Sequence, residues 1–100
     1  MSKIYAKPKF TWKNFQNKNV AVRCKTKSEA EMLALLCNIH NLPFIPCRFW
    51  NRYKSNTCFE IKDDAQGYYS ELTYFINECY IIYDFSEVYN AEEPLQGLEL

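Results

Sequence analysis

The stretch that decides the fold begins Val20-Ala-Val-Arg-Cys24 and continues through Thr26-Lys-Ser-Glu29 to Asn41. Its first five residues are rich in β-branched side chains and follow the turn-forming segment 17–19, so they predict a strand. Thr26 and Glu29 have the spacing of a capping box, in which the threonine hydroxyl accepts the Glu29 amide and the glutamate reaches back. The stretch therefore predicts a strand that leads directly into a helix.

Apolar side chains recur at helical spacing after this cap, which supports the helix. Asn41 is its expected end, and Pro43 prevents it from continuing. The main stripe consists of Ala30, Leu33, Leu36, Cys37 and His40. A second group, Met32, Leu35 and Ile39, widens that stripe. We therefore expect the helix to be covered over much of its surface.

The elements outside this unit are shorter. Residues 10–16 could form a short helix or turn that packs aromatic side chains onto the core. Pro43 and Pro46 restrict any strand at 44–50 to a sheet edge, because proline donates no hydrogen bond. Residues 80–85 are apolar enough for a strand in the sheet interior. The other expected elements are a hairpin of strands 56–61 and 66–69 around a turn at 62–65, a helix at 71–78 capped by Ser70 with the buried stripe Leu72, Phe75, Ile76 and Cys79, and one helical turn at 86–89.

This order of elements, β-α-β-β-β-α-β, predicts the α+β class. The economical architecture for 100 residues is a small, mainly antiparallel sheet with two helices packed on one face. Residues 1–89 are expected to form this single domain. Residues 90–100 form an acidic tail that is expected to be mobile, although its three leucines could dock.

Composition is typical of an ordered globular domain. Of the 100 residues, 48% are hydrophobic and 17% are aromatic, which is too apolar for a disordered chain. The basic N-terminal segment leads into no apolar run of the kind found in signal peptides, and no run is long enough to span a membrane. We therefore expect a cytoplasmic protein without membrane contact.

The five cysteines include no C-x-x-C pair, and their odd count does not make a closed disulfide framework. Zinc sites take ligands in close pairs, and Cys37 with His40 supplies only half of such a site. We expect most of the cysteines to be small buried side chains in a reducing compartment, with no metal bound.

Charge is divided along the chain although the formal net charge is zero. Residues 1–57 contain eleven of the twelve Lys and Arg, and residues 58–100 contain ten of the twelve Asp and Glu. Two readings follow. The halves could interleave in the fold, so that opposite charges become neighbours on the surface. Alternatively, a basic face could stay exposed for phosphates, for an acidic protein or for a second copy of the chain.

Cations alternate with aromatic rings in the segment 48–54, which is the candidate binding site. Tyr, Trp and Arg dominate the energetics of protein interfaces. The same residue types bind single-stranded nucleic acid, because bases stack on aromatic rings and cations neutralise phosphates. An ordinary edge segment with solvated cations would show this pattern too. The predicted binding residues are Arg48, Trp50, Arg52, Tyr53 and Lys54.

The chain contains no constellation typical of catalysis, so we expect a binding protein and not an enzyme. His40 is the one histidine, and its place on the apolar stripe of the helix favours a structural role. Asp63 and Asp64 are adjacent in a predicted turn, where neighbouring side chains tend to point apart. No Gly-rich phosphate loop, nucleophile motif or metal cluster is found, and no cofactor is expected.

Three segments, 18–30, 53–59 and 80–87, give the chain a resemblance to a known group. In size, composition and general pattern over roughly residues 10–89, it resembles the small uncharacterised proteins of phages and prophages of low-GC Gram-positive bacteria. Small phage proteins of this size commonly act on host proteins, including immune systems. The resemblance thus implies a phage accessory protein that binds and inhibits a host protein, including proteins of a defence system, as anti-CRISPR proteins do. The alternative is nucleotide or nucleic-acid binding through residues 48–54.

Overall fold

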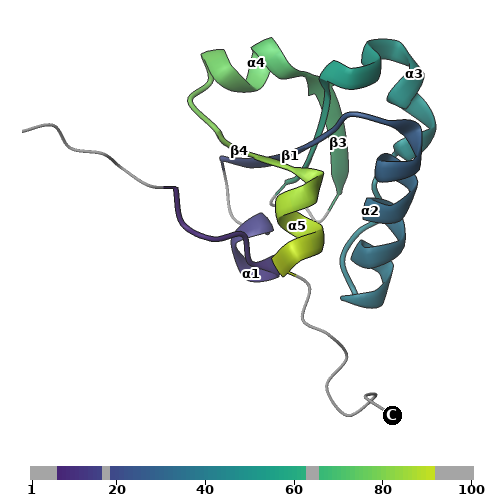
Figure 1. Cartoon of the computed structure of the whole chain (residues 1–100), viewed down its shortest axis with the longest axis vertical. Coiled ribbons are helices and arrows are strands. Elements are labelled where there is room, and N and C mark those ends of the chain that lie inside the picture. The colour runs from purple at the N-terminus through teal and green to yellow at the C-terminus, as the bar shows by residue number, and fades with distance from the viewer. Residues whose placement is uncertain (1–6, 17–18, 63–65, 92–100) are drawn as a thin grey trace, which may run out of the picture.

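The structure is a computed structural model of the chain, and it describes residues 7–16, 19–62 and 66–91 (Figure 1). Its strands are β1 (Val20–Cys24), β2 (Thr57–Ile61), β3 (Gly67–Glu71) and β4 (Ile81–Asp84). Its α-helices are α1 (Trp12–Phe15), α2 (Lys27–Ile39), α3 (Trp50–Tyr53), α4 (Leu72–Asn77) and α5 (Phe85–Ala91). Two short 3-10 helices, η1 (Cys47–Phe49) and η2 (Lys54–Asn56), flank α3. The fold belongs to the α+β class, as the sequence predicts.

The sheet is mixed, with the strand order β3-β2-β1-β4. β1 pairs antiparallel with β2, where Val22 lies opposite Phe59, and β2 pairs antiparallel with β3. β1 pairs parallel with β4, where Val22 lies opposite Tyr83. Two of the three pairings in this sheet are antiparallel, which confirms the prediction of a mainly antiparallel sheet.

β4 forms an edge of the sheet, so the prediction of an interior strand at 80–85 is wrong. Its apolar sequence has another cause, which is that side chains on both of its faces are covered. Tyr83 is buried in the main core, and Ile82 packs on the opposite face of the sheet. An apolar run indicates coverage above and below a strand, and it does not reveal whether a strand lies on each side.

Helices cover both faces of the sheet. On one face, side chains of β1, β2 and β4 pack with those of α1, α2 and α5 in the main core. On the other face, Phe75 of α4 is buried against Ala21 and Cys58 in a smaller cluster. Figure 1 shows α2 to the right of the sheet and α4 at its upper left. The structure therefore differs from the expected placement of two helices on one face, since α4 packs on the face opposite to α2. The small side chains of Ala21 and Cys58 leave room there for the Phe75 ring.

Side-chain caps start the first two helices. The Glu29 amide donates to Thr26 Oγ1 at 3.1 Å, and Glu29 Oε1 accepts from the Lys25 amide at 2.7 Å, one residue before the expected partner. The predicted capping pair is therefore confirmed with a shifted return bond. Thr11 caps α1 in the same way, accepting the Asn14 amide at 3.0 Å, so the segment 10–16 contains a helix.

α2 and α4 end alike. Asn41 follows α2 with φ of 61°, and Cys79 follows α4 with φ of 62°. In both places the amides of this residue and of the next one donate back to carbonyls of the last turn, which is a Schellman motif. The predicted end of the first long helix at Asn41 is confirmed. At the end of α4 the second donor of the motif, Tyr80, packs its ring on Phe75 with centroids 4.8 Å apart.

The segment 44–50 contains no strand, so the predicted edge strand is wrong. Ile45 is fully buried in the main core, and Pro46 directly precedes η1. The chain then turns helical, and Trp50 Nε1 donates to the Cys24 carbonyl at 2.9 Å. Because proline limits ladder pairing, the segment is anchored by the Ile45 and Trp50 side chains in place of backbone bonds.

The start of α4 also differs from the expectation. Ser70 lies within β3 and not at a helix cap, and α4 begins at Leu72. Phe75 is the fully buried member of the expected stripe, whereas Ile76 and Cys79 are exposed. A six-residue helix presents less than two turns to the sheet, and here one ring makes most of that contact.

α5 contains the predicted helical turn at 86–89 and extends it to Ala91, so the folded domain continues past residue 89. The rest of the predicted tail, residues 92–100 with its leucines, lies outside the described residues. The middle of the predicted turn at 62–65 lies outside them as well. The β2–β3 hairpin is closed by the Lys62 amide, which donates to the Gln66 carbonyl at 2.9 Å.

Replacing Cys79 by glycine should raise the free energy of unfolding by about 0.5–1 kcal/mol, because glycine adopts the left-handed conformation without the Cβ penalty. Asn41→Gly is the matched control at the equivalent position of α2. The Asn41→Gly variant should gain less free energy of unfolding, because asparagine already tolerates the left-handed conformation. Urea unfolding of both variants and the parent measures the difference. A Cys79→Gly variant no more stable than the parent would contradict the prediction.

Candidate functional site

The five predicted binding residues lie on one helical segment. Arg48 belongs to η1, Lys54 belongs to η2, and the other three belong to α3. Arg48, Arg52, Tyr53 and Lys54 are exposed. Trp50 instead packs against the main core, and its indole binds the Cys24 carbonyl. Trp50 therefore holds the segment in place, while the other four residues face outward.

Phe49 is the ring at the centre of this segment, although it is not among the predicted binding residues. It stacks on Tyr69 of β3 with centroids 4.9 Å apart and an interplanar angle of 15°. The guanidinium carbons of Arg48 and Arg52 lie 4.6 and 5.7 Å from its centroid. Contacts of this kind contribute about 0.5–1 kcal/mol at exposed sites and fix the cations in position. We call Arg48, Phe49, Arg52 and Tyr69 the Phe49 cluster.

Within the part of the chain that the structure describes, acidic side chains do not neutralise the cations of this segment. Among the residues that the structure describes, no carboxylate forms an ion pair with Arg48, Arg52 or Lys54. Three lysines elsewhere are paired, and these pairs are Lys7–Glu87 at 3.0 Å, Lys25–Asp84 at 3.8 Å and Lys62–Glu60 at 3.4 Å. The positive charge next to Phe49 is thus available to a partner.

Large apolar side chains are exposed beside the Phe49 cluster. Met32, Leu35 and Ile39 lie along the outer face of α2 with 39%, 51% and 59% of their surface exposed, and Phe44 in the following loop is 66% exposed. We call these four residues the apolar stripe. The expectation of a largely covered helix is therefore wrong for this face. At 3.6 residues per turn the three helical positions point away from the face that meets the sheet.

Phe44 lines two hollows in the surface. The first has a volume of about 350 Å³ and is lined by Phe44 with Ala34, Leu35, Asn38 and Leu42. The second has a volume of about 370 Å³ and is lined by Phe44 with Pro43, Pro46, Arg48, Gln66 and Gly67. Phe44 therefore joins the apolar stripe to the Phe49 cluster in one continuous surface.

Gly67 allows the loop after α2 to approach β3 closely. A Cβ at this position would overlap the Phe44 carbonyl oxygen and would lie 3.2 Å from the Ile45 Cα atom. These neighbours are backbone atoms, so they cannot rotate away as a flexible side chain would. The absence of a side chain at Gly67 thus permits the backbone at Phe44 to lie directly against β3.

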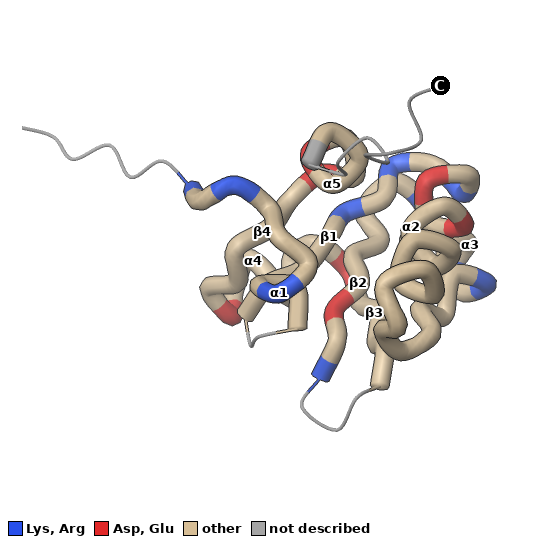
Figure 2. Tube along the Cα trace, turned by 90° about the horizontal axis from the view of Figure 1, so that it is seen from below, with Lys and Arg blue, Asp and Glu red and all other residues tan. Residues whose placement is uncertain are grey.

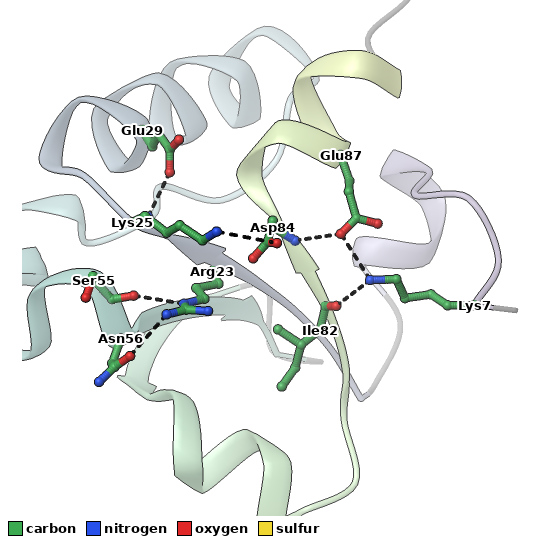
Figure 3. A network of polar contacts seen from close by, with 9 residues as sticks. All are labelled: Lys7, Arg23, Lys25, Glu29, Ser55, Asn56, Ile82, Asp84 and Glu87. Carbon is green, nitrogen blue, oxygen red and sulfur yellow. Dashed lines mark hydrogen bonds and ion pairs between the residues drawn. The ribbon is translucent and has the colours of Figure 1, made fainter.

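Opposite charges from the two halves of the chain lie together around α5. Figure 2 shows basic and acidic positions interspersed over the described residues. In Figure 3, Lys7 Nζ donates to Glu87 Oε2 at 3.0 Å and to the Ile82 carbonyl at 2.9 Å. Glu87 Oε2 also accepts from the Asp84 amide at 3.0 Å, just before α5 begins. Interleaving therefore accounts for part of the charge division, and among the described residues the segment around Phe49 is one part where no ion pair forms.

The cysteines are free thiols. Burial raises the pKa of Cys37 and of Cys58 to about 12, and burial also raises the pKa of Cys24. Protonated thiols are poor nucleophiles and poor metal ligands. Within the described residues, no group of three or more His, Cys, Asp or Glu side chains is placed to hold a metal ion. His40 stacks on Trp12 with centroids 4.4 Å apart, beside the main core.

Comparisons with protein-family models, with curated proteins and with solved structures find no match to this chain. In the described part of the chain, no helix is both long enough and apolar enough to cross a membrane. The chemistry of the exposed surface is therefore the basis for a functional proposal.

The inward position of Trp50 predicts different effects for two neighbouring residues. Trp50→Phe should lower the free energy of unfolding by about 1–2 kcal/mol, because it removes the hydrogen bond to Cys24 and some packing. Arg52→Gln, on the exposed side, should change it by less than about 0.5 kcal/mol. Chemical denaturation measures both. Equal effects of the two substitutions would contradict the structural role of Trp50.

Glu87 predicts a pH-dependent stability. Burial tends to raise its pKa, but the hydrogen bond from the Asp84 amide and the Lys7 ammonium together lower that pKa below its usual value of 4.5. A lowered pKa in the folded state adds stability above the unfolded-state pKa, and this stability is lost as the pH falls through the folded-state pKa.

Glu87→Gln should therefore reduce stability at neutral pH by less than about 1 kcal/mol, since the pair is partly exposed and screened. The difference from the parent should shrink as the pH falls below the ordinary value of 4.5. Glu78→Gln, which changes an exposed carboxylate next to α4, is the control and should show no such trend. Thermal unfolding at several pH values measures the effect. A loss of stability in Glu87→Gln that stays constant with pH would contradict the lowered pKa of Glu87 in the folded state.

Proposed function

We propose that this protein works by binding another protein through the continuous surface formed by the apolar stripe and the Phe49 cluster. The observation that carries the proposal is the exposure of four large apolar side chains in one region of a 100-residue chain. Contiguous apolar patches on folded domains mark interaction sites, because water contact with them is unfavourable until a partner covers them.

The composition of this surface supports protein binding in particular. An interface has an apolar centre, where aromatic and arginine side chains are enriched, and a polar rim. Here Leu35 and Phe44 form the centre, while Arg48, Arg52 and Tyr53 stand at one side. Arg and Tyr are also frequent among the residues whose truncation weakens binding most.

We further propose that the partner is a host protein and that binding inhibits it. The resemblance to small phage proteins supports this finer form of the proposal, including an anti-defence role of the anti-CRISPR kind. Inhibition by occupancy requires a rigid face that is complementary to the target and requires no catalytic step. A domain of this size with one firmly held surface meets that requirement.

Nucleotide or nucleic-acid binding is the second candidate, and the unpaired cations at Arg48, Arg52 and Lys54 favour it. The Phe49 ring already contacts Tyr69 and both guanidiniums, so a base could stack there only by displacing one of them. The exposed rings near these cations are Phe44 and Tyr53, whereas the aliphatic side chains of Met32, Leu35 and Ile39 offer contacts that suit a protein better than a base. Protein binding is therefore the better supported candidate.

Quantitative affinity capture of the tagged chain from a low-GC Gram-positive host tests the proposal. Leu35→Asp and Phe44→Asp should each abolish recovery of a specific partner, because a charge buried without a counter-charge opposes association. Tyr89→Asp is the matched control, since Tyr89 is 61% exposed on α5 and lies outside the stripe. It should leave recovery unchanged, and all three variants should keep the parent's melting temperature.

Recovery of the same partner by the parent and both stripe variants would rule out this surface. Copurification of nucleic acid that is lost in Arg52→Glu, with no protein partner recovered, would favour the second candidate.

A further inference from the structure

Part of the lining of the first hollow has the residue spacing of a groove on a helix surface. Ala34 and Asn38 are four residues apart on α2, and Leu42 continues the row just beyond the helix end. Rows of residues spaced by four form the grooves into which the ridges of a second helix pack. Leu35 and Phe44 line the same hollow and are both exposed, so an entering helix would find apolar contacts there.

Positive charge stands at one side of this groove. Arg48 lines the second hollow together with Phe44, and Arg52 shares the Phe49 ring with Arg48. Because the ring holds both guanidiniums, they lose little freedom when a carboxylate binds them. Among the described residues that line the two hollows, none is acidic. A partner carboxylate would thus be attracted by the two guanidiniums.

We infer that the partner presents an acidic amphipathic helix to this surface. Its apolar side chains enter the groove between Leu35 and Phe44, and its carboxylates face Arg48 and Arg52. A basic helix of the same shape would be repelled by the two guanidiniums, so the charge of the partner decides specificity more than the apolar contact does. The inference rests on the proposed function and adds the chemistry of the partner to it.

Two synthetic helical peptides test this inference on the full chain. Both carry the same leucines at helical spacing, and their flanking positions are all glutamate in one and all lysine in the other. Titrated into nitrogen-15-labelled protein, the glutamate peptide should shift the amides of Leu35, Asn38 and Phe44. It should bind roughly tenfold more tightly than the lysine peptide. Raising sodium chloride from about 0.05 M to about 0.5 M should lower the ratio of the two peptide affinities, because salt screens exposed charges.

The double variant Arg48→Gln, Arg52→Gln should bring the affinity ratio of the two peptides close to one. Lys13→Gln is the matched control, because it removes an exposed cation from α1, and it should leave the ratio unchanged. Amide spectra of the free variants show whether each one keeps the parent fold. The measured ratio therefore reports charge recognition and not stability.

Equal affinity of the parent for the two peptides would overturn the inference, while the proposed function would still be judged by the capture experiment with Leu35→Asp. A single-stranded oligonucleotide that shifts the same amides and displaces the glutamate peptide would overturn it in favour of nucleic acid. Sedimentation that shows self-association through the apolar stripe, abolished by Leu35→Asp, would overturn it in favour of a second copy of the chain.

Discussion

The end of β1 is where the parts of the binding surface are held together. The Cys24 carbonyl accepts the Trp50 indole, and the next amide, of Lys25, donates to the capping glutamate of α2. Arg23 extends the attachment, because its guanidinium donates to the Ser55 carbonyl at 2.9 Å and to the Asn56 side chain at 3.3 Å (Figure 3). α2 and the segment around α3 are thus fastened to the same three residues. A hydrogen bond contributes only about 1 kcal/mol to stability, but several together fix relative position.

The strand and helix at the start of the fold could be predicted from sequence because their signals are local. Thr26, Glu29 and Asn41 act within a few residues of where they stand, and the structure places each of them as expected. The position of β4 could not be predicted, because an apolar strand reads the same at an edge as in the interior when its two faces are covered. The predicted strand after Pro43 is wrong for a related reason. Buried side chains anchor this segment in place of the strand pairing that its sequence favours.

The candidate site was predictable only in part. Arg48 and Arg52 could be predicted because cations beside aromatic rings can be seen in the sequence. Tyr69, the ring that stacks on Phe49, is brought next to them by the β2–β3 pairing, which the local sequence does not show. The sequence predicts a covered helix because Met32, Leu35 and Ile39 extend the apolar pattern beyond the buried stripe, and the pattern does not say how far the neighbouring elements reach around the helix. The capping spacing of Asp84 and Glu87 was present in the sequence and could have been used.

The parallel pairing of β1 with β4 has a consequence for synthesis of the chain. It brings Val20 opposite Ile81, roughly sixty positions later, whereas β2 and β3 are neighbours in sequence. On the ribosome, β1 therefore emerges long before its last partner strand and presents an open edge in the meantime. Closing so long a loop is entropically costly and slows folding. The nascent N-terminal half thus passes through a stage at which its sheet is incomplete and β1 has an unpaired edge.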